Sequence, residues 1–137
     1  MTRSIIKAKE ITVVVKNEVC ALARIMSFLV NHSINLESIA GYSNHSGDQG
    51  SLIFITNNNM AAINELLSNG YRDIGENEVI VVELENRPGA LKNISELLAQ
   101  NGININYIYC TTCKSGCPAK IVLNTSDNEK AFKILSL

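Results

Sequence analysis

The stretch that decides the fold of this chain is Val79-Ile-Val-Val82, followed by Leu84-Glu-Asn86-Arg87-Pro88-Gly89-Ala90-Leu91. The first run is apolar and β-branched, which is typical of a strand buried on both faces or nearly so. Pro88 fixes φ near the helical value and lacks an N–H group, so it suits the first position of a helix, and Gly89 allows close approach to the backbone. The stretch therefore predicts a strand, a tight turn and the start of a helix.

The predicted helix has one apolar face and ends near Asn101-Gly102, because glycine is favoured just past a helix end. Its face consists of Ala90, Leu91, Ile94, Leu97 and Leu98. A turn that leads into a helix start leaves backbone N–H groups free to bind an anion. Asn86 and Asn104 add amides that donate and accept hydrogen bonds, so these residues suit a free amino acid. Alternatively, they only shape the connection and bind nothing.

The run Leu84–Leu91, followed by Gly102-Ile103-Asn104-Ile105, resembles the opening strand, loop and helix of an ACT domain, a small regulatory module of amino-acid metabolism. In that family the loop and the Asn after the helix line a pocket for a small effector, usually an amino acid, where two domains meet. Some amino-acid-binding members carry a polar residue where this chain has Leu84. The resemblance implies a ligand site made by Asn86, Arg87, Pro88, Gly89, Ala90 and Asn104.

The sequence also repeats itself at an offset of 69 residues without a gap. Both core and turn positions recur, including Ile11 with Ile80, Asn17 with Asn86, Asn35 with Asn104, Ser46-Gly47 with Ser115-Gly116, Thr56 with Thr125 and Leu66 with Leu135. Chance apolar patterning would not align both kinds of position. We therefore predict two copies of one unit, over residues 1–75 and 76–137.

The loop of the first copy differs from that of the second in its chemistry. It keeps Asn17 and Asn35 as candidate ligand-binding residues, but it has Val19 and Cys20 where the second copy has Pro88 and Gly89, and it adds the carboxylate of Glu18. A Cβ atom and a carboxylate make this site narrower and less favourable for an anion. We expect the second loop to bind more readily, while the first is silent or forms the opposite wall of a shared pocket.

Each copy is predicted to be strand, helix, strand, hairpin turn, strand and helix. In the first copy the ranges are Glu10–Lys16, Ala21–Asn31, Ile34–Ser43, Ser51–Thr56 and a helix through Met60–Leu67. Tyr71–Ile74 is a weak strand that continues almost directly into the Val79 run. This order predicts an α+β fold of two tandem ferredoxin-like βαββαβ (ACT-like) repeats, each an antiparallel sheet with helices on one face.

The second copy lacks or shortens its last strand, because the chain stops after the helix. Ser126 and Glu129 have the spacing of a capping box that starts this helix. A missing strand leaves an open sheet edge, which native proteins cover or pair. We therefore predict a homodimer, with sheets joined edge to edge or helices packed face to face.

Three cysteines, Cys110, Cys113 and Cys117, are spaced C-x₂-C-x₃-C. They could hold zinc or an iron–sulfur cluster, or Cys113 and Cys117 could pair across the turn. Three ligands leave zinc without a fourth, a reducing cytoplasm disfavours a disulfide, and cysteine is often just a small buried apolar residue. We predict the structural role and no metal or cofactor, with a metal or redox site as the lesser alternative.

Composition narrows the classes of function. The 137 residues are 46% apolar and 18% charged with a net charge of −1, which fits a compact protein without a field that attracts nucleic acid. No secretion signal and no membrane-spanning apolar run are visible, so we expect a cytoplasmic protein that binds no membrane. His32 and His45 have no nucleophile or carboxylate patterned beside them, so we predict no enzyme.

Together these patterns predict a regulatory sensor that binds a small amino-acid-like ligand at the strand–helix loop and at a repeat or dimer interface. Its signal would pass through assembly or through a metabolic enzyme as partner. One alternative is a ligand-free interaction subunit that regulates such an enzyme. The other is a cysteine-based metal or redox sensor.

Overall fold

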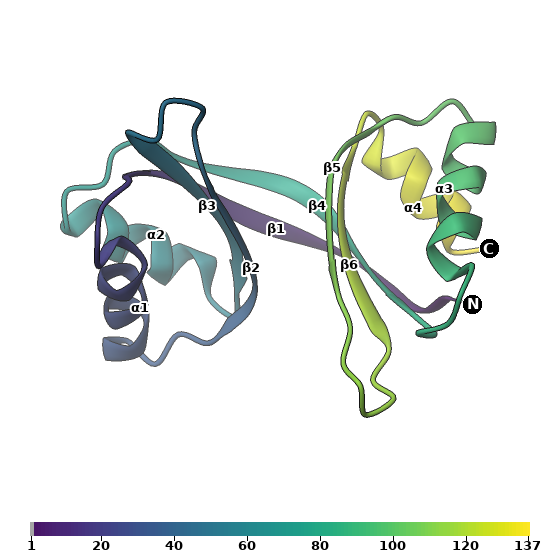
Figure 1. The fold of residues 1–137 in the computed structure, drawn as a ribbon, viewed down its shortest axis with the longest axis horizontal. Helices are drawn as coiled ribbons and strands as arrows, with labels where there is room; N and C mark the ends of the chain where they lie inside the picture. Colours follow the sequence, from purple (N-terminus) through teal and green to yellow (C-terminus); the bar gives the residue numbers. More distant parts are fainter. Residues whose placement is uncertain (1) are drawn as a thin grey trace. The chain divides into compact units, whose positions relative to one another are not determined.

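A computed structural model of the chain describes residues 2–137, apart from the side chain of Arg3. Met1, with which the first predicted repeat begins, lies outside the described residues. The elements in chain order are β1 (Thr2–Lys16), α1 (Ala21–Asn31), β2 (Leu36–Ser43), β3 (Gln49–Thr56), α2 (Asn59–Ser68), β4 (Ile74–Leu84), α3 (Ala90–Gln100), β5 (Ile105–Thr111), β6 (Ala119–Thr125) and α4 (Asn128–Leu135) (Figure 1).

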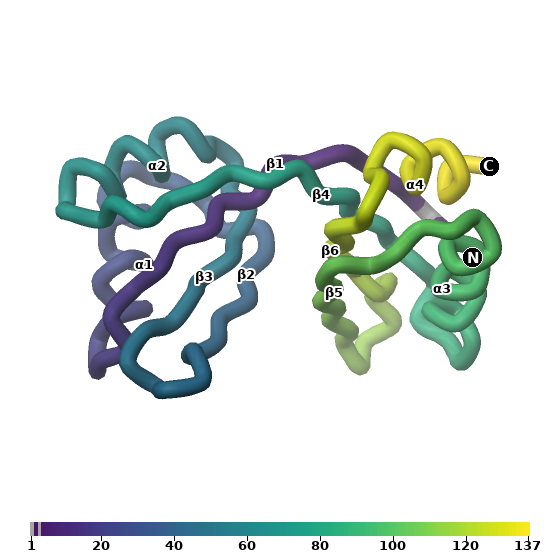
Figure 2. Tube along the Cα trace, turned by 90° about the horizontal axis from the view of Figure 1, so that it is seen from above, coloured from purple at the N-terminus to yellow at the C-terminus, as the bar shows by residue number. Residues whose placement is uncertain are grey.

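The chain divides into two compact units, and two long strands contribute to both. The N-terminal unit is Lys9–Asn77, and the C-terminal unit is Glu78–Leu137 together with residues 2–8. The strand order is β2-β3-β1-β4-β6-β5, and β1 and β4 run side by side in Figures 1 and 2. Each unit therefore contains four strand segments, ordered β2-β3-β1-β4 in the N-terminal unit and β1-β4-β6-β5 in the C-terminal unit.

In the N-terminal unit, α1 and α2 cover one face of the sheet (Figure 1). The antiparallel register pairs Ile11 with Phe54 and Val13 with Leu52, so these side chains point to the same face. Ile11, Phe54 and the helix residue Ile25 are fully buried. The alternation of β1 therefore supplies one side of a core that the two helices close.

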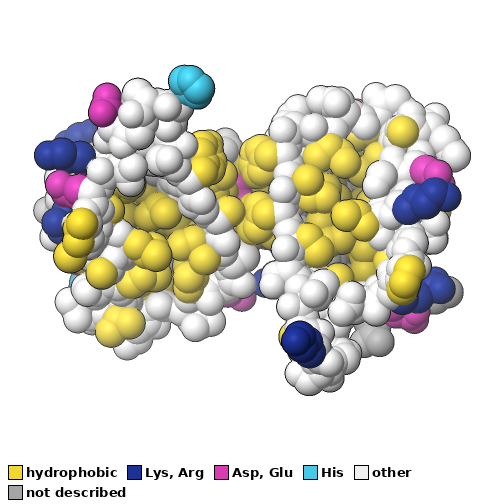
Figure 3. All heavy atoms as spheres, viewed as in Figure 1, with side chains coloured by type: hydrophobic (Ala, Val, Ile, Leu, Met, Phe, Trp, Pro, Cys, Tyr) yellow, Lys and Arg dark blue, Asp and Glu magenta, His cyan; other side chains and the backbone are white. Residues whose placement is uncertain are grey.

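The C-terminal unit has an equivalent core under α3 and α4. Its buried side chains come from β4, β6 and both helices, and they include Ile80, Val82, Leu84, Ile94, Leu98, Ile121, Leu123, Ala131 and Leu135. Figure 3 shows apolar side chains gathered in the middle of each unit on the face in view. Val79–Val82 is almost fully buried along its whole length, at 0 to 6% exposure, as its apolar run predicts.

The N-terminal residues 2–8 complete this second sheet. Ile5 packs against the core of the C-terminal unit, and Lys7 Nζ lies 2.7 Å from the Glu129 carboxylate of α4 and 5.0 Å from the centroid of the Phe132 ring. β1 thus takes the place beside β4 where a closing strand would lie. The predicted open edge is filled, so it no longer supports a homodimer.

Several boundaries confirm the sequence predictions and others correct them. Helix α1 has the predicted range, and β4 is one continuous strand, although it begins at Ile74 and leaves Tyr71–Asp73 outside. The prediction that Pro88 is the first helical residue is wrong, because Gly89 is the N-cap of α3, with φ of 88°.

The capping box of α4 is also displaced by one residue. Asp127 is the N-cap, and its side chain accepts a hydrogen bond from the Lys130 N–H group at 3.0 Å. Ser126 Oγ instead accepts a hydrogen bond from the Asn104 N–H group at 2.9 Å. Both Ser and Asp are good caps, and the tertiary partner of Ser126 decides between them.

The 69-residue repeat extends to individual hydrogen bonds. Asn59 Oδ1 accepts from Thr56 Oγ1 at 2.8 Å, and its Nδ2 donates to the Lys9 carbonyl at 2.8 Å. Asn128 Oδ1 accepts from Thr125 Oγ1 at 2.8 Å, and its Nδ2 donates to the Glu78 carbonyl at 2.9 Å. In both units, one asparagine at a helix start therefore links the threonine at the end of one strand to a backbone carbonyl of the adjacent strand.

Candidate functional site

The loop between β4 and α3 has the features of an anion-binding helix start. Gly89 adopts a left-handed conformation that glycine tolerates without strain, and its lack of a side chain leaves α3 without a side-chain cap. No acidic residue lies in the first turn of α3. The helices α2 and α4 differ, because Asn58 and Asp127 cap them through their side chains.

An open groove of about 720 Å³ separates this loop from the β5–β6 hairpin. Its walls are Glu85, Asn86 and Arg87 on one side and Thr112, Cys113, Lys114 and Gly116 on the other. Arg87 Nε lies 3.2 Å from the Glu85 carboxylate, so these two charges offset each other.

Polar side chains in the groove remain available, among them Lys114 and Asn86. Within the described part of the chain, the Lys114 ammonium forms no ion pair and the Asn86 amide forms no hydrogen bond. The groove therefore has one positive charge in excess and an amide that both donates and accepts. These groups fit the carboxylate and the amino group of a small zwitterion.

A smaller cavity of about 250 Å³ lies on the helix side of the same loop. Arg87 and Ala90 line it together with apolar side chains that include Leu84, Ile94 and Ile134. Pro88 and Gly89 line neither cavity and act only through the backbone turn that they shape.

Asn104 lies at the other end of α3 from the loop. Helix α3 has 11 residues, which corresponds to a length of about 16 Å. The Asn104 backbone N–H group donates to Ser126 Oγ at 2.9 Å, and its carbonyl accepts from the Ser126 N–H group at 2.8 Å. Within the C-terminal unit, the structure does not bring Asn104 together with Asn86. Asn35 takes the equivalent position in the N-terminal unit, where its N–H group donates to Asn57 Oδ1 at 2.9 Å.

The equivalent loop of the N-terminal unit is closed on its hairpin. Asn17 Nδ2 donates to the Gly47 carbonyl at 2.8 Å, and the Asn17 N–H group donates to the Asp48 carbonyl at 3.0 Å. Glu18 accepts from Arg24 at 3.2 Å, and this hydrogen bond raises the pKa of the Arg24 guanidinium. The first loop therefore uses its amide and its carboxylate on the protein's own groups.

A separate groove of about 560 Å³ lies beside this first loop and is mostly apolar. Val15, Leu22, Ile39 and Leu52 are among its lining residues.

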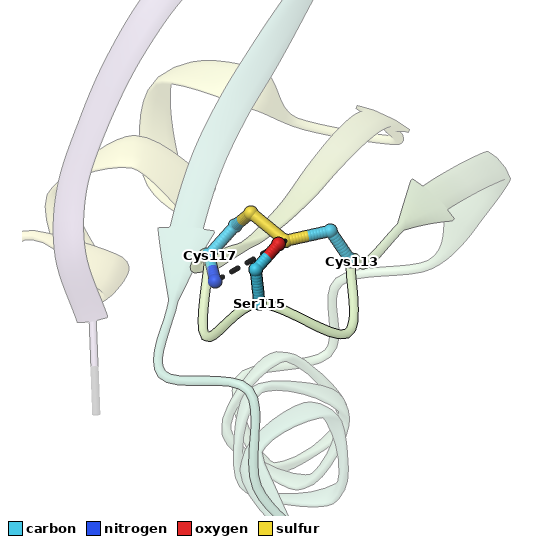
Figure 4. Close-up of a disulfide and its surroundings, with 3 residues drawn as sticks. All are labelled: Cys113, Ser115 and Cys117. Carbon is cyan, nitrogen blue, oxygen red and sulfur yellow. Dashed lines mark hydrogen bonds between the residues drawn. A yellow bond between two sulfur atoms is a disulfide. The ribbon is translucent and has the colours of Figure 1, made fainter.

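The structure joins Cys113 and Cys117 in a disulfide across the hairpin turn (Figure 4). Their Cα atoms are 5.6 Å apart, within the range that a disulfide requires. The prediction of small buried residues is wrong, because Cys110 and Cys117 are exposed and Cys113 is half-buried. Cys110 is a free thiol, and desolvation of the part of it that the protein covers raises its pKa. The described residues contain no cluster of three or more His, Cys, Asp or Glu that could hold a metal ion.

His32 has a carboxylate partner that its sequence position did not indicate. Its Nε2 lies 2.7 Å from Glu65. More than half of the His32 side chain is exposed, and the pair joins the end of α1 to α2. The His32–Glu65 pair is a surface contact between the two helices.

The hairpin wall, above all Lys114, is the part of the site that sequence reasoning missed. The hairpin approaches the loop only because β6 pairs with both β4 and β5. The repeat contained a signal for it, because Ser46-Gly47 aligns with Ser115-Gly116 and so marks equivalent turns.

No helix of the described chain is long and apolar enough to span a membrane.

Residues 80–136 match the sequence model of the AHAS small subunit-like ACT domain. No curated protein matches the chain. Among solved structures, protein BT0572 from Bacteroides thetaiotaomicron is similar, with a TM-score of 0.87 and 24% identity over 96% of this chain and 88% of that one.

The regulatory subunit of aspartate kinase from Thermus thermophilus, in its ligand-free form, has a TM-score of 0.68 and 12% identity, over 99% of this chain and 95% of that one. A structure of aspartokinase alpha and beta subunits has a TM-score of 0.66 and 16% identity, over 98% and 96% of the two chains. At these identities the likeness shows the fold. The family model covers residues 80–136, so this part of the chain is similar to the AHAS small subunit-like ACT domain.

Proposed function

We propose that the chain is a non-catalytic regulatory protein that binds a small amino-acid-like ligand in the groove between Glu85–Arg87 and the β5–β6 hairpin. The observation that carries this proposal is the pair of uncommitted groups, Asn86 and Lys114, facing one open groove. The regulatory role is supported by the matched family, an AHAS small subunit-like ACT domain, and by the fold shared with an aspartate kinase regulatory subunit.

The roles of the groups follow from their charges. The Lys114 ammonium and the Asn86 amide N–H groups bind the ligand carboxylate. The Glu85 carboxylate and the Asn86 carbonyl oxygen accept hydrogen bonds from the ligand amino group. Arg87, Pro88, Gly89 and Ala90 shape the loop, and the backbone of the α3 start adds positive potential.

The proposed architecture is two tandem ACT-like repeats, with sequence boundaries at residues 1–75 and 76–137. In space, residues 2–8 of the first repeat serve as the last strand of the second. The supporting observation is that Asn59 and Asn128 make the same hydrogen bonds 69 residues apart. We keep the homodimer as part of the proposal, because Asn104 and the equivalent Asn35 are exposed and reach a ligand only across an interface with another ACT domain. Sedimentation of the intact protein at micromolar concentration as a monomer would contradict this part.

A thermal-shift screen against the twenty amino acids tests the ligand. A ligand present at a hundredfold its Kd stabilises the protein by about 2.7 kcal/mol, which is a readily measured shift. The affinity for the best amino acid should fall about tenfold or more in Asn86→Ala and Lys114→Ala, because each loses a hydrogen bond to a charged group.

Asn17→Ala is the matched control, since Asn17 occupies the equivalent position but is bonded to Gly47. It should leave the affinity unchanged. Equal losses in Asn17→Ala and Asn86→Ala would place the site elsewhere.

The second candidate function is a ligand-free subunit that regulates a metabolic enzyme by packing on it. It is favoured by large apolar side chains on the surface of the N-terminal unit, where Val19, Val30 and Met60 are each more than 70% exposed. If no amino acid shifts the melting temperature and Val30→Asp abolishes binding to a copurifying enzyme, this function replaces the first.

A further inference from the structure

We propose that the Cys113–Cys117 disulfide is a reversible redox switch that sets the affinity of the groove for its ligand. This inference rests on the proposed function, because it concerns the hairpin wall of the same groove. It adds a regulatory input, the thiol–disulfide state, to a site whose other wall is the loop before α3.

The switch sits directly on the groove. Cys113 lines it together with its neighbours Thr112, Lys114 and Gly116. The disulfide closes a ring of five residues around the turn and includes Lys114, the ammonium group that the ligand carboxylate meets. The state of the bond therefore decides how firmly this charge is held.

The equivalent hairpin of the N-terminal unit achieves the same turn without sulfur. Asn44 occupies the position of Cys113, and its Oδ1 accepts from the Gly47 N–H group at 2.8 Å and from Ser46 Oγ at 3.1 Å. In the C-terminal hairpin, the Cys117 N–H group lies 3.3 Å and Ser115 Oγ 3.6 Å from Cys113 Sγ (Figure 4).

Sulfur is a weak acceptor, so hydrogen bonds alone hold the second turn less firmly than they hold the first. The covalent Cys113–Cys117 bond holds the second turn in place of the stronger hydrogen bonds that hold the first. Only the second hairpin is therefore sensitive to reduction.

The surroundings of the two sulfur atoms decide which one an external thiolate attacks and which one departs. Cys117 is exposed and Cys113 is half-buried, so an external thiolate reaches Cys117 Sγ more easily. The N–H group of Cys117 and the hydroxyl of Ser115 both donate to Cys113 Sγ. These hydrogen bonds stabilise the thiolate that forms on Cys113 when the disulfide breaks.

The proposed reductant is a dithiol. Its thiolate attacks Cys117 Sγ, the Cys113–Cys117 bond breaks, and the electron pair stays on Cys113 Sγ, which then takes a proton. The second thiol of the reductant then attacks the reductant's sulfur atom in the mixed disulfide. This step releases the Cys117 thiol, and the reductant leaves as a cyclic disulfide. Two electrons and two protons pass to the protein, and a disulfide oxidant reverses the sequence.

Cys110 takes no part in this cycle. It is a free thiol beside the Thr111 carbonyl, and it lies outside the five-residue ring that the disulfide closes. It is therefore the natural control cysteine.

The oxidised protein binds more tightly, because a preorganised wall loses less conformational entropy when the ligand arrives. We expect the affinity to fall about tenfold on reduction, the equivalent of ordering one or two further side chains.

The test uses the full chain, oxidised or reduced with dithiothreitol, and has two readouts that need no ligand. Alkylation and mass spectrometry should count two further thiols in the reduced protein, at Cys113 and Cys117, and the pair should re-form on removal of the reductant. Trypsin should cut after Lys114 faster in the reduced form, because the turn is released. Failure of the pair to form, or equal cleavage rates, would overturn the switch.

The third readout is calorimetric titration with the amino acid that gives the largest thermal shift. Cys110→Ser should keep the difference between the two states. The double variant Cys113→Asn with Cys117→Asp copies the first hairpin and should bind with the same affinity with and without dithiothreitol. If it fails to fold, Cys113→Ser with Cys117→Ser replaces it and should bind like the reduced protein.

The outcomes separate the two proposals. Equal affinity in both redox states of the unsubstituted protein overturns the switch and leaves the ligand site intact. If no amino acid binds in either state, the proposed ligand site fails. The coupling of the disulfide to ligand binding fails with it, whatever the thiol count shows.

Discussion

In the N-terminal unit the Asn17 amide of the loop before α1 is bonded to the hairpin, whereas in the C-terminal unit the equivalent Asn86 amide is unbonded among the described residues and lines the groove between the loop and the hairpin. The backbones are alike, because Cys20 and Gly89 are both left-handed N-caps, with φ of 74° and 88°. The side chains differ in charge. The first loop pairs Lys16 with Glu18, and the second pairs Glu85 with Arg87 in the reverse order.

This difference shows how two units with alike backbones can differ in the side chains of equivalent loops. The shared hydrogen bonds of Asn59 and Asn128 keep the elements in place in both units. The residues at the loop and the hairpin are free to diverge, since they contribute little to the cores. An amide that closes a turn in one unit is available to a ligand in the other.

The largest effect should come from deletion of residues 1–8. The C-terminal unit should be destabilised by more than about 4 kcal/mol, because it loses a strand and the Ile5 contact with its core. Hydrogen exchange should show lost protection in Glu78–Leu137 and retained protection in Lys9–Asn77.

Lys7→Ala is the control for this deletion, since it removes only an exposed ion pair with Glu129. It should cost less than about 1 kcal/mol. Equal loss of protection in both units after the deletion would show that residues 2–8 do not belong to one unit alone.

The next effect compares Asn59→Ala with Asn128→Ala. Each should destabilise by about 2 kcal/mol, because each removes the acceptor of a buried threonine hydroxyl and one hydrogen bond to a strand carbonyl. Urea unfolding followed by circular dichroism measures both. A cost in one variant only would break the equivalence of the two units.

A smaller effect separates Asn17 from Asn86. Asn17→Ala should cost about 1 kcal/mol, because it breaks the bond to the Gly47 carbonyl, and Asn86→Ala should cost almost nothing. The same unfolding measurement applies. A larger loss for Asn86→Ala would mean that this amide stabilises the fold and is not held ready for a ligand.

The smallest effect concerns the left-handed position of the first loop. Cys20→Gly should stabilise the protein by about 0.5 kcal/mol, because relief of the left-handed strain slightly exceeds the extra entropy that glycine loses on folding. Thermal unfolding detects this change. A destabilised variant would show that the Cys20 side chain makes a contact worth more than the strain.

The residue pattern predicted most of the elements and the repeat, because these depend on local periodicity. Ala21–Asn31 and the continuous β4 strand follow from apolar spacing and from the Val79–Val82 run. The N-cap of α4 was predicted one residue early, since Ser126 and Asp127 are both suitable caps. The choice between them depends on Asn104, which is distant in sequence.

The candidate site was predicted only in part. The loop Asn86–Gly89 is readable because proline and glycine have strong local preferences. Lys114 was not, since its place opposite Asn86 follows from how the β5–β6 hairpin is carried past the loop. Asn104 was grouped with the loop through the family resemblance, although a whole helix separates them within the unit.

By itself the sequence determined the α+β elements, the 69-residue repeat and the turn before α3, because each depends on residues close together in the chain. Only the tertiary structure decided that residues 2–8 close the second sheet, that Cys113 pairs with Cys117, and that Asn17 bonds to its hairpin while Asn86 does not. These features depend on contacts between distant segments, whose free energies are set by packing and register and leave no local pattern.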